Sequence, residues 1–326
     1  MTTTSPSPDR SLGRRAVLAG TLGAAALVAT GSAATATAAQ PVLDPREHPT
    51  GGRRGGAARR DDAGIRAIEE RHDRRVGVHA RNLRTGAELV HRPDETFATC
   101  STFKTLAVGA VLAGRLTVPD RRALQRRAYW PPSLVAGAGY APRLQAWQDA
   151  GYAPTVAEVC DATVADSDNA GANLLLQLVG GPAGVTALAR ALGDRTTTLT
   201  RWEPDLNEWE PGQTFDVTSP RAIGRSHEQL LVGNGLDRAG RARLRGWMLA
   251  NRTGDGTLRA GLPDGWTLAS KTGSGARGTR NDVGVAWAPD GTPLLISCLT
   301  NGPEADSPSI DAPLAEVAAR CVEALA

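Results

Sequence analysis

Two lysines stand apart in a chain that otherwise carries its positive charge on arginine. Lys104 and Lys271 are the only lysines among 37 Lys and Arg residues. Arginine stays protonated in proteins, whereas lysine can be tuned to lose its proton and act as a base. Two isolated lysines therefore indicate chemistry, although their number alone is equally compatible with mutational drift.

Ser101 and Lys104 lie three residues apart at the start of a segment with a helical pattern, so both would face one side of a helix. In the first turn the Ser101 backbone N–H has no intrahelical partner and could stabilise an oxyanion. A neutral Lys104 could take the serine proton and so activate the serine as a nucleophile. The pattern S-x-x-K also occurs by chance in chains of this length.

Two further short motifs combine hydroxyl, amide and amine groups. Ser167-Asp168-Asn169 precedes a predicted helix, where these residue types also serve as ordinary N-terminal caps. Lys271-Thr272-Gly273-Ser274 lies in a predicted strand, where glycine lets a ligand approach the backbone closely. A solvated edge lysine beside a bulge is the alternative for this second motif.

The apolar pattern predicts the elements that position these motifs. Helical spacing of Ile65 and Ile68 precedes strand patterns in "RVGVHARN" and "AELVH". Strand patterns return in "WTLASKTG", "DVGVAWA" and "PLLISCLT", followed by an amphipathic segment at 312–326. The part between is mostly helical, and the predicted helices span 101–113, 169–179, 182–192 and 220–231, the last with Ser219 as its N-cap.

The order of these elements predicts an α/β plus all-α fold. Two strands near the start and three near the end suggest one five-stranded antiparallel sheet, built from both chain ends and flanked by helices. We expect an α/β domain from residues 61–98 and 251–326, with an all-helical domain inserted at 99–250. The helical domain contains an irregular loop at 201–216, and loops of that length are usually functional or disordered.

The first sixty residues differ from the rest in charge and pattern. Arg14-Arg15 precede an apolar run at 16–29 that is too short to span a bilayer, which predicts a signal peptide at 1–38 for the twin-arginine route. An uncleaved anchor or a flexible alanine-rich tail is the alternative. Residues 39–60 lack apolar periodicity and predict a disordered lead-in. Residues 1–60 carry a net charge of +5. Because the whole chain carries +3, residues 61–326 carry −2, which argues against binding to nucleic acid or to an anionic membrane.

Cysteine and histidine positions argue against a disulfide framework and against a metal site. The cysteines are widely spaced in a chain large enough to fold without disulfides, so we expect thiols at Cys100, Cys160, Cys298 and Cys321. The five histidines lack ligand spacing such as H-E-x-x-H, so we expect no metal.

S-x-x-K, S-D-N and K-T-G, in this order, resemble the motifs of the penicillin-recognising serine enzymes. The irregular loop adds "RWEPDLN", which is similar to the R-x-E-x-x-L-N pattern of class A serine β-lactamases. The similarity runs from about Asp61 to the C-terminus. It implies an exported, monomeric, cofactor-free enzyme of actinobacterial type that hydrolyses the β-lactam amide of penicillins and cephalosporins.

The resemblance implies roles for residues of the catalytic steps. Ser101 corresponds to the acylated nucleophile, and either Lys104 or Glu203 acting through a water would be the acylation base. Ser167 would return a proton to the lactam nitrogen. Glu203, with Asn207, would position the hydrolytic water.

The resemblance also implies how the substrate is held. Asn169 would hold the acylamide side chain, and the backbone N–H groups of Ser101 and Ser274 would form the oxyanion hole. Tyr140 would form a wall of the cleft, and Arg201 would pair with Asp216 to close the loop. The groups implied to receive the substrate carboxylate are Lys271, Thr272, Ser274 and Arg280.

Two departures and two rival functions bear on this reading. Cys160 matches one half of a family disulfide, but Val108 occupies the partner position; Cys100 matches half of a carbapenemase bridge, but Gly275 stands opposite it. The absence of the carbapenemase bridge therefore argues against broad carbapenemase activity.

A D,D-peptidase would not need Glu203 on the loop. A β-lactam sensor that stays acylated normally lacks such a carboxylate and often carries a transmembrane segment.

Overall fold

The computed structural model describes residues 59–60 and 62–326. The predicted signal peptide at 1–38, and all but the end of the predicted lead-in at 39–60, lie outside the described residues. Export therefore stays a prediction.

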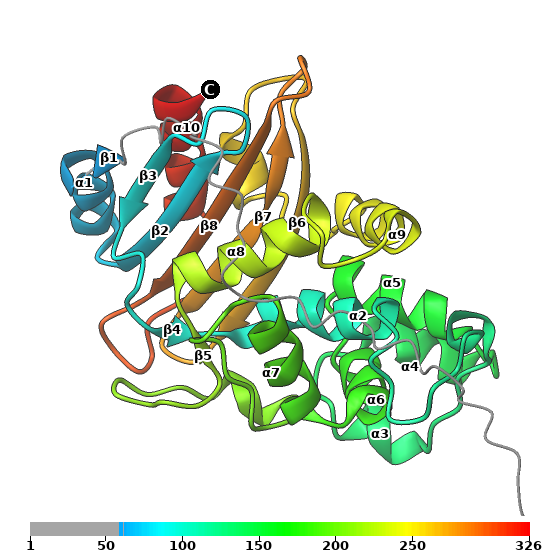
Figure 1. The fold of residues 1–326 in the computed structure, drawn as a ribbon. Helices are drawn as coiled ribbons and strands as arrows, with labels where there is room; N and C mark the ends of the chain where they lie inside the picture. The colour runs from blue at the N-terminus through cyan, green and yellow to red at the C-terminus, as the bar shows by residue number, and fades with distance from the viewer. Residues whose placement is uncertain (1–58, 61) are drawn as a thin grey trace, which may run out of the picture. The chain divides into compact units, whose positions relative to one another are not determined.

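The five antiparallel strands expected from the sequence are confirmed, and they form one sheet (Figure 1). In chain order they are β2 (Arg75–Asn82), β3 (Glu88–His91), β6 (Thr267–Gly275), β7 (Thr279–Trp287) and β8 (Pro293–Asn301). β2 pairs with β8 and places Val78 opposite Cys298, so the two ends of the folded chain share one sheet. A two-residue strand, β1 (Arg59–Arg60), pairs in parallel with β3, so the last two residues of the predicted disordered lead-in are in regular structure.

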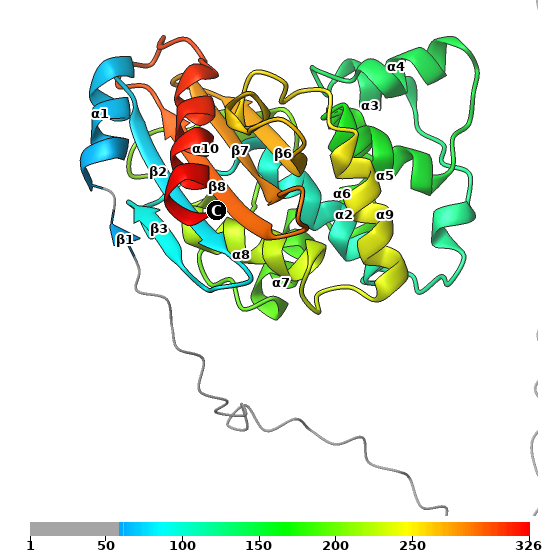
Figure 2. The same cartoon turned by 90° about the horizontal axis from the view of Figure 1, so that it is seen from above.

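Helices cover both faces of this sheet. α1 (Asp62–His72) and α10 (Ala312–Leu325) lie on one face (Figure 2), where Ile65 and Ile68 join the apolar core. α8 (Pro220–Leu231) lies on the other face, against β2, β7 and β8. The predicted boundaries placed α8 in the helical domain, because a local apolar pattern does not reveal whether a helix packs on a sheet or on other helices. Ser219 caps α8 as predicted, since its side chain accepts the Ala222 backbone N–H at 3.3 Å.

The inserted domain packs its helices around α2 (Lys104–Leu112) (Figure 1). Every residue of α2 from Lys104 to Val111 is buried, as expected for a helix that is apolar on all sides. The other helices of this part are α3 (Pro132–Ala136), α4 (Pro142–Asp149), α5 (Val156–Ala165), α6 (Asn169–Val179), α7 (Pro182–Ala191) and α9 (Arg238–Leu249).

A second, two-stranded sheet marks the point where the chain enters the helical part. β4 (Phe97–Ala98) pairs with β5 (Val217–Thr218), and the Thr99 N–H donates to Asp216 O at 2.9 Å. These contacts join the approach to Ser101 to the end of the irregular loop. Neither strand was predicted from the sequence, because two residues are too few to show an alternation of apolar and polar side chains.

No single helix among the described residues is long and apolar enough to cross a membrane, and α6 with α7 meets that criterion only as a pair bent by 71°. No group of three or more metal-ligating side chains occurs in the part of the chain that the structure describes.

Candidate active site

A cleft of about 360 Å³ lies where the sheet edge meets the helical domain. Most of the predicted site residues meet there, and the full lining consists of Ser101, Tyr140, Ser167, Asn169, Asn207, Thr253, Thr272, Gly273, Ser274 and Arg280. Lys104, Glu203 and Lys271 are buried and contact this lining from beneath. Thr253 belongs to none of the motifs, and no local signal in the sequence distinguished it.

Ser101 occupies a 3-10 turn, η1 (Cys100–Phe103), that runs directly into α2. The helix predicted from residue 101 therefore begins with a tighter turn. Cys100 has a φ of +43° and Ser167 a φ of +57°, in the left-handed region that non-glycine residues rarely adopt. Backbone strain of this kind concentrates at functional sites, and here it occurs next to Ser101 and in the S-D-N motif.

Lys104 is the central hydrogen-bond donor beneath the cleft. Its Nζ lies 2.5 Å from Asn169 Oδ1, 2.8 Å from Ser167 O and 3.0 Å from Glu203 Oε1. Its side chain is fully buried, and burial lowers the pKa of its ammonium group, while the Glu203 carboxylate raises it in part. The three acceptors match the three N–H bonds of an ammonium.

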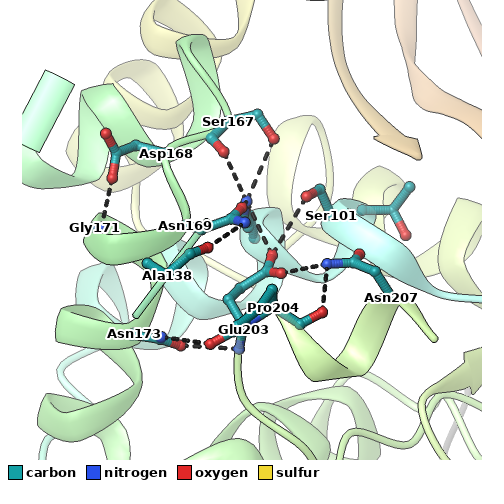
Figure 3. Close-up of polar contacts among 12 residues, drawn as sticks. Ser101, Ala138, Ser167, Asp168, Asn169, Gly171, Asn173, Glu203, Pro204 and Asn207 are labelled. Atoms are coloured by element: carbon teal, nitrogen blue, oxygen red, sulfur yellow. Dashed lines mark hydrogen bonds and ion pairs between the residues drawn. The ribbon is translucent and has the colours of Figure 1, made fainter. Parts of the chain in front are cut away.

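The Glu203 carboxylate lies between Ser101 and Asn207 (Figure 3). Ser101 Oγ donates to Glu203 Oε1 at 3.4 Å, and Asn207 Nδ2 donates to Glu203 Oε2 at 2.5 Å. The backbone of Glu203 is held on both sides by the Asn173 side chain, which accepts from its N–H at 3.0 Å and donates to its carbonyl at 2.9 Å. Asn173 was not predicted, and its amide fixes where the carboxylate enters the cleft.

Ser167 connects the two lysines. Lys271 Nζ donates to Ser167 Oγ at 2.9 Å, and Lys104 Nζ lies 3.4 Å from the same oxygen. Burial lowers the pKa of Lys271 well below its usual value, and the positive charge of Lys104 lowers it further. A hydroxyl between two amines with lowered pKa values is suited to passing a proton to the cleft.

One end of the cleft is rich in cationic and hydroxyl groups. Arg280 Nη1 donates to Ser274 Oγ at 3.0 Å, and Arg280 Nε donates to Asp311 Oδ1 at 2.6 Å. Thr272 and Ser274 line the same end. An anionic group of a ligand would find both charge and donors here.

Glycines on β6 allow the strand to approach the nucleophile. A Cβ at Gly273 would lie 3.2 Å from Ser101 N, and one at Gly275 would lie 2.6 Å from Asn207 O and 2.7 Å from Cys100 Sγ. Cys100 therefore faces a glycine, as predicted, and its thiol is buried. The other cysteines are buried as well.

The irregular loop is anchored at its base by Asp216. This side chain is fully buried and accepts from Thr200 N at 2.7 Å, Arg201 N at 3.1 Å and Arg201 Nε at 2.7 Å. The last contact is the ion pair expected from the sequence, and it ties the start of the loop to its end.

Replacing Asp216 with asparagine should lower the free energy of unfolding by about 2 kcal/mol, because an amide nitrogen would face donors and Arg201 would lose its partner. Urea denaturation followed by circular dichroism measures this loss. Asp205→Asn, at an exposed carboxylate of the same loop, is the matched control. Equal stability of the two variants would show that the buried contacts do not anchor the loop.

A serine that lines a cleft with a cationic end, beside a buried lysine and carboxylate, is typical of the active site of a serine hydrolase. Comparison with known proteins gives a narrower answer. The model of the Beta-lactamase enzyme family matches residues 62–325. The chain is 44% identical to a beta-lactamase of Streptomyces cellulosae over 94% of both chains, and 43% identical to one of Streptomyces fradiae over 96% of both.

Solved structures agree with the sequence relatives. The beta-lactamase from Streptomyces albus G matches with a TM-score of 0.77 at 41% identity, over 80% of this chain and 98% of that one. The chain therefore belongs to the beta-lactamase family and is a serine β-lactamase.

Proposed function

We propose that this enzyme hydrolyses penicillins and cephalosporins through an acyl-enzyme on Ser101, as class A β-lactamases do. In acylation, Ser101 Oγ forms a bond to the lactam carbonyl carbon, and the bond from that carbon to the ring nitrogen breaks. The backbone N–H groups of Ser101 and Ser274 would stabilise the oxyanion. Water then cleaves the ester and regenerates Ser101.

We assign the Ser101 proton to Glu203. The Lys104 Nζ already has three acceptors within 3.0 Å, so an ammonium satisfies all of them and a neutral amine does not. Ser101 Oγ already donates toward Glu203 Oε1 at 3.4 Å. Lys104 then stabilises the carboxylate by its charge, and its lowered pKa leaves it available as a base if Glu203 is removed.

The departing lactam nitrogen needs a proton, for which Ser167 is the best-placed donor. The Lys104 Nζ lies 3.0 Å from Glu203 Oε1 and 3.4 Å from Ser167 Oγ, so the proton that Glu203 took from Ser101 would pass through Lys104 to replace the one that Ser167 donates, and Glu203 would return to a carboxylate. In deacylation, Glu203 and Asn207 would hold the attacking water, and Glu203 would take a proton from this water and pass it to Ser101 Oγ as the ester bond breaks.

The cationic end of the cleft suits the fixed carboxylate that penicillins and cephalosporins carry. Arg280, Thr272 and Ser274 supply donors there, with Lys271 adding charge from beneath. Asn169 Nδ2 donates to Ala138 O at 2.9 Å, and its Oδ1 is bound to Lys104, so this amide has a fixed orientation toward the acylamide side of the cleft.

The proposal rests on the position of the Glu203 carboxylate beside Ser101, because a second base at this place can activate the water that hydrolyses the acyl-enzyme ester. A D,D-peptidase or a non-turnover sensor would not need it. Incubation of the enzyme with excess penicillin, followed by intact mass and by product release, tests the proposal. We expect many turnovers per enzyme and no persistent adduct. A stable one-drug adduct on the parent enzyme would instead indicate a peptidase or a sensor.

A further inference from the structure

Thr253 places a second hydroxyl directly behind the Thr272 hydroxyl in the cleft. The two Oγ1 atoms are 2.5 Å apart, and either could be the donor. Thr253 Oγ1 also lies 2.8 Å from Asn251 Oδ1. Both threonines line the cleft at the end that carries Arg280. Thr253 therefore has two possible acceptors for one proton.

The Asn251 side chain has a fixed orientation. Its Oδ1 accepts the Thr253 backbone N–H at 2.9 Å, which identifies this atom as the oxygen. Its Nδ2 donates to Ser270 Oγ at 3.4 Å. Because Asn251 Oδ1 keeps the backbone N–H in every case, it does not depend on the Thr253 hydroxyl.

Two proton arrangements are therefore possible, and both leave every buried group with a partner. In the first, the Thr272 hydroxyl donates to Thr253 and the Thr253 hydroxyl donates to Asn251. In the second, the Thr253 hydroxyl donates to Thr272, and the Thr272 proton is free to point into the cleft. A hydroxyl that itself accepts a hydrogen bond becomes a better donor, so the second arrangement suits an anion in the cleft.

We propose that Thr253 is a positioning residue for the substrate carboxylate, switching its proton from Asn251 to Thr272 when the carboxylate binds. The inference rests on the proposed role of Thr272 as a carboxylate-binding group. It adds a residue that acts through Thr272 and lies outside the sequence motifs.

Packing around the two hydroxyls supports a direct contact between them. A Cβ at Gly254 would lie 3.2 Å from Thr272 Cγ2 and 2.9 Å from Asn251 Nδ2, so the backbone closes over this group. Arg280 Nη2 donates to Thr253 O at 3.0 Å, so the backbone of the same residue also holds the guanidinium. Side chain and backbone of Thr253 thus both serve the anion-binding end of the cleft.

The test measures ligand affinity in a Ser101→Ala background by calorimetry, using one penicillin and its methyl ester. Thr253→Val keeps the shape and the backbone contacts but removes the hydroxyl. It should weaken binding of the free acid about fivefold, the worth of one net hydrogen bond, and binding of the neutral ester less than about twofold. Thr253→Ser should restore affinity for the acid. Thr267→Val, at an exposed position of β6, the strand that holds Thr272, is the matched control and should change neither affinity.

An equal loss on acid and ester would show a general packing effect, and unchanged affinity for the acid would show that Thr272 needs no support; either result overturns the inference. Failure of Ser101→Ala to bind the acid at all also counts against it. Product formation by Ser101→Ala would refute the Ser101 acyl-enzyme instead, and it is followed separately in the same mixtures. The two failures are thereby distinguished.

Discussion

A Glu203→Ala variant mixed with a penicillin should stall as a covalent adduct on Ser101, with kcat lowered by about a thousandfold. General acid–base groups contribute about 10²–10⁴-fold to rate, and this carboxylate is assigned to both steps. The two steps should not suffer equally. Deacylation loses the base that contacts Asn207, whereas acylation retains a second base in Lys104.

The electrostatics of Lys104 explain why acylation continues in that variant. Burial lowers the pKa of Lys104, and the negative charge of Glu203 counteracts this effect. Removing Glu203 therefore lowers the pKa of Lys104 further and also removes one of its acceptors, so a neutral amine becomes available to take the Ser101 proton. The rate of adduct formation in Glu203→Ala should accordingly rise with pH as Lys104 deprotonates.

Intact mass spectrometry at timed intervals measures the adduct, and peptide mapping locates it. Glu208→Ala, at an exposed carboxylate of the same loop, is the control and should turn over like the parent. Rapid turnover by Glu203→Ala would refute the deacylation role. Absence of any adduct would refute Lys104 as the reserve base.

Lys104→Met should lower kcat/KM by about a thousandfold, and it should do so without accumulating an adduct. Its charge and its contacts with Ser167, Asn169 and Glu203 are lost together, so both candidate bases are disabled. The Glu203 carboxylate is then buried without a cation, a change that typically costs about 3–5 kcal/mol of stability. The comparison with Glu203→Ala separates a defect in acylation from a defect in deacylation.

Pre-steady-state acylation and thermal unfolding should be recorded together for Lys104→Met. Arg238→Met, which removes an exposed cation from α9, is the control and should leave both unchanged. A folded Lys104→Met protein that acylates at the parent rate would show that Glu203 needs no buried lysine. An adduct that accumulates as in Glu203→Ala would show that Lys104 acts in deacylation.

The sequence by itself determined the chemistry-bearing residues and the class of enzyme. Ser101 and Lys104 are one helical turn apart, and Lys271 to Ser274 lie on one strand, so local geometry fixes their relations whatever the rest of the chain does. The long apolar patterns likewise predicted the five antiparallel strands and the central helix. The position of Gly275 opposite Cys100 was predicted from the resemblance to the family.

Only the tertiary structure decided which groups share one cleft. Glu203 reaches Lys104 because Asn173 and the Asp216 anchor hold a loop that has no regular pattern of its own. The strands β4 and β5 and the placement of α8 on the sheet depend on contacts between distant segments, which leave no periodicity in the sequence. Thr253 is the clearest case: it joins Thr272 across 19 residues, and proximity across such a separation is a property of the packed fold alone.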